Sequence, residues 1–207
     1  MTVFTKFLGV VVLALGACAD TTDRYILENE PSAVHVHSRV RFVLVRTVSL
    51  PTYAAAEEIA VKGNEGIIRI SNEGLWADDP ERATTLVITR HLTEMTNATV
   101  AAEPWPLSES PEAAIDVRVQ NFFPTPENTL RLSGLYFLGG EEIEEVENFD
   151  DAEFPTTPKV PRRTIRSRTV PFEFVVPLPD YSISALVRGQ SVLLRALSEK
   201  IAYDLSR

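Results

Sequence analysis

The most regular hydrophobic pattern lies at the end of the chain. From Tyr181 to about Ser206, apolar residues recur at intervals of three and four, which places them on one side of an α-helix. This apolar side comprises Ile183, Leu186, Val187, Leu193, Leu194, Leu197, Ile201 and Leu205. The pattern predicts a long C-terminal helix, capped by Asp180, that packs on a sheet. A helix lying on a membrane surface is the alternative, but such a helix would carry more Lys and interfacial Trp.

The polar side of the same helix holds two basic residues. Arg188 and Arg195 lie roughly opposite the apolar side, together with Ser184, Ser191 and Ser198. We interpret the two arginines as a candidate contact surface for an acidic partner. A solvated polar face explains them equally well.

A second helix is predicted from Asp79 to about Thr96. Asp79 is a good N-cap, and Pro80 suits the first helical position. The adjacent acids Asp78 and Asp79 are therefore interpreted as a helix cap, not as a catalytic carboxylate pair. Trp76 precedes the helix and is expected to be a buried anchor, with ligand stacking as the alternative.

Strand patterns fill the rest of the chain, at residues 24–27, 39–50, 57–62, 67–71, 115–120, 129–138 and 164–176. Residues 39–50 are apolar on both alternating sets, which is typical of a central strand covered on both faces. Residues 115–120 alternate strictly and predict a strand with one solvated face. The links at 63–66 and 124–128 predict antiparallel pairs. We therefore expect one α/β domain over 24–207, with a mixed, mostly antiparallel sheet packed by two main helices, the longer one C-terminal.

An insertion at about 139–163 interrupts this pattern. Residues 141–153 contain eight acidic side chains, and three prolines follow at positions 155, 158 and 161. Because like charges repel and the segment has little to bury, a mobile surface loop is the main interpretation. An acidic metal site is the alternative, although nothing in the pattern fixes a coordination geometry.

Composition excludes several classes of protein. With 44% hydrophobic and 24% charged residues, the chain is not disordered throughout. A net charge of −9 argues against a nucleic-acid partner, since phosphate contacts need clustered Lys and Arg. The single cysteine excludes an internal disulfide and any cysteine-based metal site.

The start of the chain has the pattern of a bacterial lipoprotein leader. Lys6 precedes the apolar run Phe7–Leu15, and Leu15-Gly16-Ala17-Cys18 follows, which resembles a lipobox. We predict a signal peptide at 1–17, a diacylglycerylated and N-acylated (palmitoylated) Cys18 as the new N-terminus, and a polar tether at 18–23. The apolar run is too short to span a bilayer. An ordinary signal peptide with a chance cysteine and a buried N-terminal helix are the alternatives.

The residue after the predicted lipid anchor indicates a destination. In enteric bacteria, Asp at that position retains a lipoprotein in the inner membrane, whereas this chain has Ala19. The sequence therefore favours the outer membrane, with the domain facing the periplasm, over the inner membrane.

The chain offers few residues for catalysis. His35 and His37 share one face of an extended segment, but no third histidine or cysteine completes a metal site. His91 is placed on the polar face of the second helix, beside Arg90 and Glu94. Nucleophile elbows, phosphate-binding glycine loops and zinc-protease motifs do not occur in the sequence. We expect no cofactor, no metal and no enzymatic activity.

Several short motifs occur in an order that resembles a known family. They are the lipobox ending at Cys18, R-Y-I-L at 24–27, G-L-W-A at 74–77, I-D-V-R-V-Q-N-F at 115–122, G-L-Y-F-L at 134–138 and S-E-K-I-A at 198–202. Their order and spacing resemble the auxiliary lipoproteins of ABC-type transport, of the paraquat-inducible protein C type. The acidic insertion departs from the short turn expected in that family.

The resemblance implies a periplasmic α/β domain anchored to the outer membrane. Its partner would be a mammalian-cell-entry (MCE) domain protein of a system that moves lipids between membranes. The auxiliary lipoprotein would act as a docking component, with a homo-oligomeric ring as one arrangement. The alternative is an envelope lipoprotein that assembles or regulates another periplasmic machine, such as a cell-wall synthase.

Overall fold

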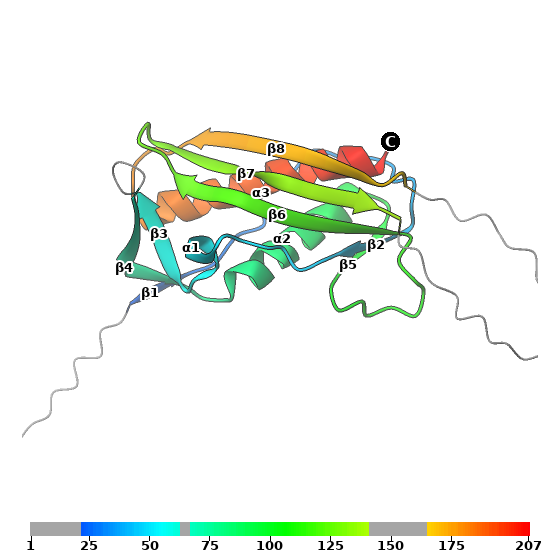
Figure 1. Ribbon diagram of the computed structural model, residues 1–207, viewed down its shortest axis with the longest axis horizontal. Coiled ribbons are helices and arrows are strands. Elements are labelled where there is room, and N and C mark those ends of the chain that lie inside the picture. Colours follow the sequence, from blue (N-terminus) through cyan, green and yellow to red (C-terminus); the bar gives the residue numbers. More distant parts are fainter. Residues whose placement is uncertain (1–21, 63–66, 141–164) are drawn as a thin grey trace, which may run out of the picture.

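The structure is a computed structural model that describes residues 22–62, 67–140 and 165–207. The two long helices lie behind one face of a long twisted sheet, and a smaller sheet closes one end (Figure 1). The strands are β1 (Asp23–Tyr25), β2 (Phe42–Val45), β3 (Glu58–Lys62), β4 (Ile68–Trp76), β5 (Thr99–Ala102), β6 (Ala113–Pro124), β7 (Thr129–Gly139) and β8 (Arg168–Pro177). The helices are α1 (Thr52–Ala55), α2 (Pro80–Met95) and α3 (Ile183–Leu205). This arrangement confirms the predicted α/β class with the longest helix at the C-terminus.

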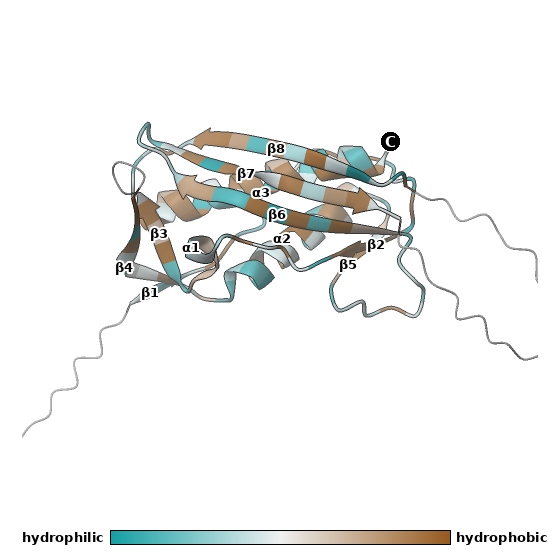
Figure 2. Cartoon of the chain, viewed as in Figure 1, coloured by the Kyte–Doolittle hydropathy of each residue, from teal (hydrophilic) through white to brown (hydrophobic). Residues whose placement is uncertain are grey.

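The five-stranded sheet has the order β5-β2-β6-β7-β8. Its three long strands, β6, β7 and β8, pair antiparallel, with Asp116 opposite Phe137 and Leu135 opposite Pro171. Successive side chains point to opposite faces, which explains the alternating hydrophilic and hydrophobic bands of these strands (Figure 2). The predicted solvated face of 115–120 is confirmed, because Arg118 and Gln120 are exposed while Ile115, Val117 and Val119 are buried.

The central strand of the sheet is shorter than predicted. The strand expected over 39–50 is β2, which spans Phe42–Val45 and pairs parallel with both β5 and β6. Val43, Leu44 and Val45 are all buried, so the prediction of a central strand covered on both faces is confirmed. β5 was not predicted, because its four residues Thr99–Ala102 are too few to show a period.

The smaller sheet has the order β1-β4-β3. β3 and β4 form the predicted antiparallel pair, and β1 runs parallel to the end of β4, with Asp23 opposite Gly74. β4 continues to Trp76, beyond the predicted end at residue 71, and a register shift occurs between Glu58 and Ala60. Gly74 lies where the sheet meets α3, and a Cβ there would approach the Ile183 side chain at 2.9 Å.

The helix caps agree only in part with the sequence predictions. Asp79 caps α2 as predicted, accepting a hydrogen bond from the Arg82 backbone N–H at 2.7 Å. α3 is capped by Ser182, not by Asp180, since the Ser182 side chain accepts from the Ala185 N–H. The Asp180 carboxylate instead accepts the Ser182 N–H at 2.8 Å, so it forms the turn that precedes the helix.

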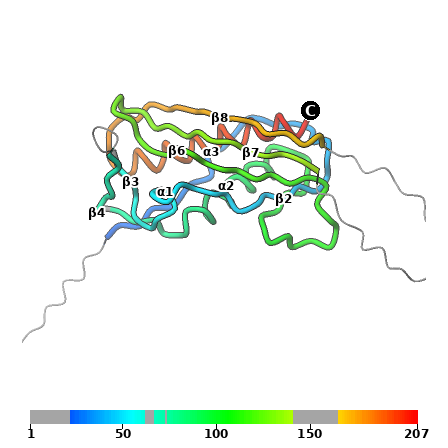
Figure 3. Tube along the Cα trace, in the orientation of Figure 1, coloured from blue at the N-terminus to red at the C-terminus, as the bar shows by residue number. Residues whose placement is uncertain are grey.

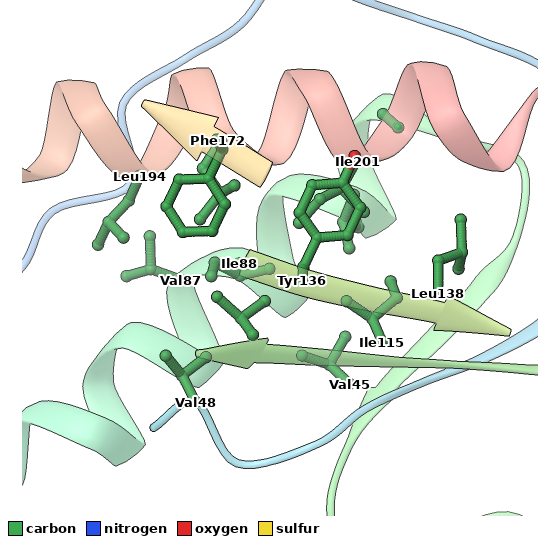
Figure 4. Close-up of a cluster of buried hydrophobic side chains, with 14 of the residues drawn as sticks. Val45, Val48, Val87, Ile88, Ile115, Tyr136, Leu138, Phe172, Leu194 and Ile201 are labelled. Atoms are coloured by element: carbon green, nitrogen blue, oxygen red, sulfur yellow. The ribbon is translucent and has the colours of Figure 1, made fainter. Parts of the chain in front are cut away.

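The core lies between the five-stranded sheet and the two long helices. Tyr136 and Phe172 from the sheet meet Leu194 and Ile201 from α3 (Figure 4). Burying such side chains is the main stabilising contribution to the fold. A second cluster joins the small sheet to the first turns of α3 and includes Trp76, whose predicted burial is confirmed.

An extended segment of the chain, residues 26–40, links the small sheet to the opposite end of the molecule (Figure 3). We call it the N-terminal strap. Its backbone N–H groups donate to the carbonyl of Met95 in α2 (from Val36) and to that of Leu205 in α3 (from Arg39). The strap is therefore bound to both long helices.

Several predictions concern residues outside those that the structure describes. These are the signal peptide at 1–17, Cys18 with most of the tether at 18–23, the turn at 63–66 and nearly all of the insertion at 139–163. Of the strand predicted over 164–176, the structure shows β8 from Arg168 to Pro177.

Candidate functional site

The predicted basic surface of the C-terminal helix is not a continuous patch. Arg188 is exposed, but Arg195 is ion-paired with Glu199 at 2.8 Å, and these two side chains are 31% and 24% exposed. Glu199 also accepts a hydrogen bond from Ser32 of the strap at 2.7 Å. Arg195 therefore helps to hold the strap on α3, and only Arg188 keeps the freely exposed position that was predicted for both.

His91 does not lie on a polar surface, as the sequence predicted, but is completely buried. Its Nε2 lies 2.9 Å from the backbone oxygen of Glu30 in the strap, and its Nδ1 lies 3.3 Å from Ser198 Oγ in α3. A carbonyl oxygen only accepts, so Nε2 carries the proton in the neutral ring. Burial lowers the pKa of His91, while the hydrogen bond to Glu30 and the charges of Glu94 and Glu199 partly offset that effect.

Two serines predicted to lie on the solvated side of the C-terminal helix are also buried. Ser191 accepts a hydrogen bond from the Glu28 backbone N–H at 3.0 Å, and Ser198 faces His91. Ser191 is buried because the strap covers it and needs polar partners for its backbone, whereas Ser198 is buried where α2 packs on α3. The predicted apolar side of this helix is confirmed, because its eight residues are all buried, but the prediction of a solvated opposite side is wrong for Ser191 and Ser198.

A third buried polar group lies at the opposite end of the molecule from β1. The hydroxyl of Tyr136 donates to the Asp204 carboxylate, and Arg168 lies 3.4 Å from the other oxygen of that carboxylate. Burial, followed by the hydrogen bond to Asp204, raises the pKa of Tyr136 well above its ordinary value. Because this cluster joins β7, β8 and the end of α3, we interpret it as a structural clamp.

The face of the long sheet turned away from the helices is a candidate interaction surface. We call it the outer sheet face and define it by Asp116, Arg118, Arg131, Leu135, Phe137 and Glu173. Its charges are paired: Asp116 with Arg118 at 2.8 Å, and Arg131 with Glu173 at 3.5 Å. No helix of the described residues covers this face in Figure 1.

Aromatic and apolar side chains lie among these charge pairs. The guanidinium of Arg118 lies 5.0 Å from the ring centre of Phe137, and both Phe137 and Leu135 are half-buried. Paired charges around partly exposed apolar groups are typical of protein-binding surfaces. The sequence predicted the wet face of 115–120 but not that Leu135 and Phe137 share it.

The part of the chain that the structure describes shows no cluster of three or more metal-binding side chains. His35 and His37 are exposed, as predicted. Among the same residues, none of the helices combines the length and the apolar character needed to cross a bilayer.

The sequence matches a known protein family over most of its length. A family described as the ABC-type transport auxiliary lipoprotein component matches residues 25–202. The chain belongs to this family. The matched region of this auxiliary lipoprotein runs from the end of β1 to the last turn of α3, so it includes both sheets and the strap.

Solved structures share the fold of the auxiliary lipoprotein. A crystal structure of an uncharacterized protein has a TM-score of 0.66 at 16% identity, covering 90% of this chain and 100% of its own. The crystal structure of protein XCC0632 from Xanthomonas campestris, of the DUF330 family, has a TM-score of 0.53 at 14% identity, covering 87% of this chain and 90% of its own. At these identities the likeness concerns the fold alone. No curated protein matches the sequence.

Proposed function

We propose that this auxiliary lipoprotein is anchored to the outer membrane through Cys18 and serves as the periplasmic docking component of an MCE-type ABC lipid transport system. It contributes a positioned surface and performs no catalysis. The membership of residues 25–202 in a family of transport auxiliary lipoproteins is the observation that carries this proposal. The lipobox-like sequence Leu15-Gly16-Ala17-Cys18 supports the anchor, and Ala19 supports the outer membrane.

The fold suits such a role. An adaptor needs a rigid domain, an attachment point and a surface left free for a partner. The strap and the two helices form a layer on one face of the sheet, and no helix of the described residues covers the outer sheet face on the other side. A homo-oligomeric ring would multiply the contacts to one partner and raise the avidity.

The anchor is tested by changing Cys18 to Ala. Because Cys18 is the only cysteine, the variant should incorporate no palmitate analogue and should no longer sediment with membranes. Ala17→Ser, which leaves a small residue before the cysteine, is the matched control and should be labelled normally. Labelling that persists in the Cys18→Ala variant would contradict lipid attachment at this position.

The partner is tested by crosslinking in intact cells, followed by mild solubilisation, affinity capture and mass spectrometry. Recovery of an MCE-domain protein is the expected result. Recovery of a cell-wall synthase with no MCE-domain protein would contradict the transport role. It would favour a lipoprotein that assembles or regulates the cell-wall synthase.

A further inference from the structure

One end of the molecule exposes three isoleucines, and no described residue covers them. Ile67, Ile68 and Ile70, which we call the isoleucine patch, are 57%, 37% and 46% exposed. Ile68 and Ile70 lie at the beginning of β4 and point to the same face of the strand, while Ile67 directly precedes the strand and exposed Arg69 points to the opposite face. Large apolar side chains grouped on a surface are unfavourable in water and mark contact sites.

The same end of the molecule is where the described chain begins. β1 starts there at Asp23, beside β4 (Figure 1). The register pairs Asp23 with Gly74, four residues beyond Ile70 on the same strand. At about 3.3 Å per residue along the strand, Ile70 lies about 13 Å from that pairing and Ile67 about 23 Å.

The length of the tether limits how far this end can lie from the lipid anchor. Five peptide units join Cys18 to Asp23. An extended chain spans at most about 3.6 Å per residue, so the acylated cysteine stays within about 18 Å of Asp23. This reach is comparable to the distance from Asp23 to the isoleucine patch, so a membrane that holds Cys18 lies within contact range of the patch.

We infer that the isoleucine patch is a second membrane contact, which enters the boundary between lipid headgroups and acyl chains beside the anchor. This inference rests on the lipid anchor of the proposed function. Apolar side chains gain free energy at that depth, and the adjacent Arg69 is suited to anionic headgroups. Two contacts, unlike a single tether, would fix the tilt of the domain and the direction of its outer sheet face.

The single cysteine allows a direct test in the full-length lipoprotein. If Cys18 is acylated, the variant Ile68→Cys contains one free thiol, which can carry an environment-sensitive NBD fluorophore. The labelled protein is placed in vesicles of phosphatidylethanolamine and phosphatidylglycerol that contain lipids spin-labelled near the headgroup. Tyr203→Cys is the matched control, because Tyr203 is 47% exposed but lies near the other end of α3.

We expect a blue-shifted emission at position 68 and at least a twofold loss of intensity from the spin-labelled lipid, with neither effect at position 203. Equal, unquenched emission at both positions would overturn the inference. A blue shift at 68 without lipid quenching would also overturn it, in favour of a second copy or another protein covering the patch.

The two failures can be told apart. Quenching is measured only on protein that floats with the vesicles, so it reports on the patch and not on attachment. Loss of the anchor itself is detected separately, by absent palmitate labelling of the unmodified chain.

Discussion

Buried polar side chains determine how the strap and the helices of this domain are held together. His91 and Ser198 face each other across the two long helices, while Ser191 accepts the Glu28 backbone N–H of the strap. Each of these groups would be costly to bury without a partner. Their contribution to the free energy of unfolding therefore depends on protonation and on the identity of each side chain.

Acid should loosen the contact between the strap and the helices. The pKa of His91 is lower in the folded chain than its ordinary value of 6.5, mainly because the ring is buried. The unfolded chain therefore binds a proton more readily, so the free energy of unfolding is highest above pH 6.5 and falls as the pH decreases through 6.5 toward the folded pKa. Chemical denaturation from pH 7.5 to 5 should show this fall.

The control for this prediction is His91→Gln, which cannot titrate. Its stability should change less than that of the unmodified chain over the same range. Glu94 contributes little over this pH range, because its ordinary pKa of 4.5 lies below pH 5. Hydrogen bonds from Arg90 and Asn29 lower that pKa further in the folded chain. An equal pH dependence in both proteins would assign the effect to other groups.

A single glycine is expected to permit the close pairing of β6 and β7 at their register shift. A Cβ at Gly134 would lie 2.2 Å from the Arg118 backbone oxygen, beside the register shift between Val119 and Asn121. The backbone cannot move without breaking the ladder, so Gly134→Ala should lower the free energy of unfolding by about 1–3 kcal/mol.

The matched control is Gly139→Ala in the same strand. There the nearest atom is the Ser167 hydroxyl oxygen at 2.7 Å, and a side chain can rotate away. Urea denaturation should therefore show a clearly smaller change. Equal losses in both variants would mean that the contact with the Arg118 backbone oxygen is not what makes position 134 sensitive.

At the scale of elements, periodicity in the sequence predicts the helices and strands that have one buried face and one solvated face. α2 and β7 match their predicted bounds closely, because solvent lies on one side and the core on the other. β6 includes the predicted strand at 115–120 but is longer, from Ala113 to Pro124. The polar side of α3 was predicted wrongly, because part of it is covered by the strap. The strap residue Glu28, which contacts Ser191, lies 163 residues away from it in the chain. No local pattern reports such a distant partner, although serines at 191 and 198, seven residues apart, share one helical side.

The apolar side of α3 gives an element-scale prediction. Leu197 is completely buried against the sheet, so Leu197→Ala should cost about 2–5 kcal/mol of unfolding free energy. Arg195→Ala removes a partly exposed ion pair and should cost less than about 1 kcal/mol. Thermal or urea denaturation of both variants measures the contrast, and a larger loss at Arg195 would mean that the strap contact dominates.

For the whole molecule, the arrangement of surfaces restricts where a partner can bind. One face of the long sheet is covered by α2 and α3, and the strap covers part of the helices. The end with β1 is directed toward the membrane if Cys18 is the anchor. Among the described residues, these relations leave the outer sheet face without a covering helix. They could not be deduced from the sequence, because they depend on which strands become neighbours.

We therefore expect the transport partner to bind the outer sheet face. A photoreactive benzoylphenylalanine at Glu173, whose side chain is 58% exposed, should crosslink to the partner in cells. The same residue at Arg90, 67% exposed on α2, is the control and should give no such product. Both positions carry one member of an exposed ion pair, so replacing either should leave the thermal midpoint nearly unchanged. Crosslinks from position 90 alone would move the docking surface to the helices, where Arg188 remains exposed.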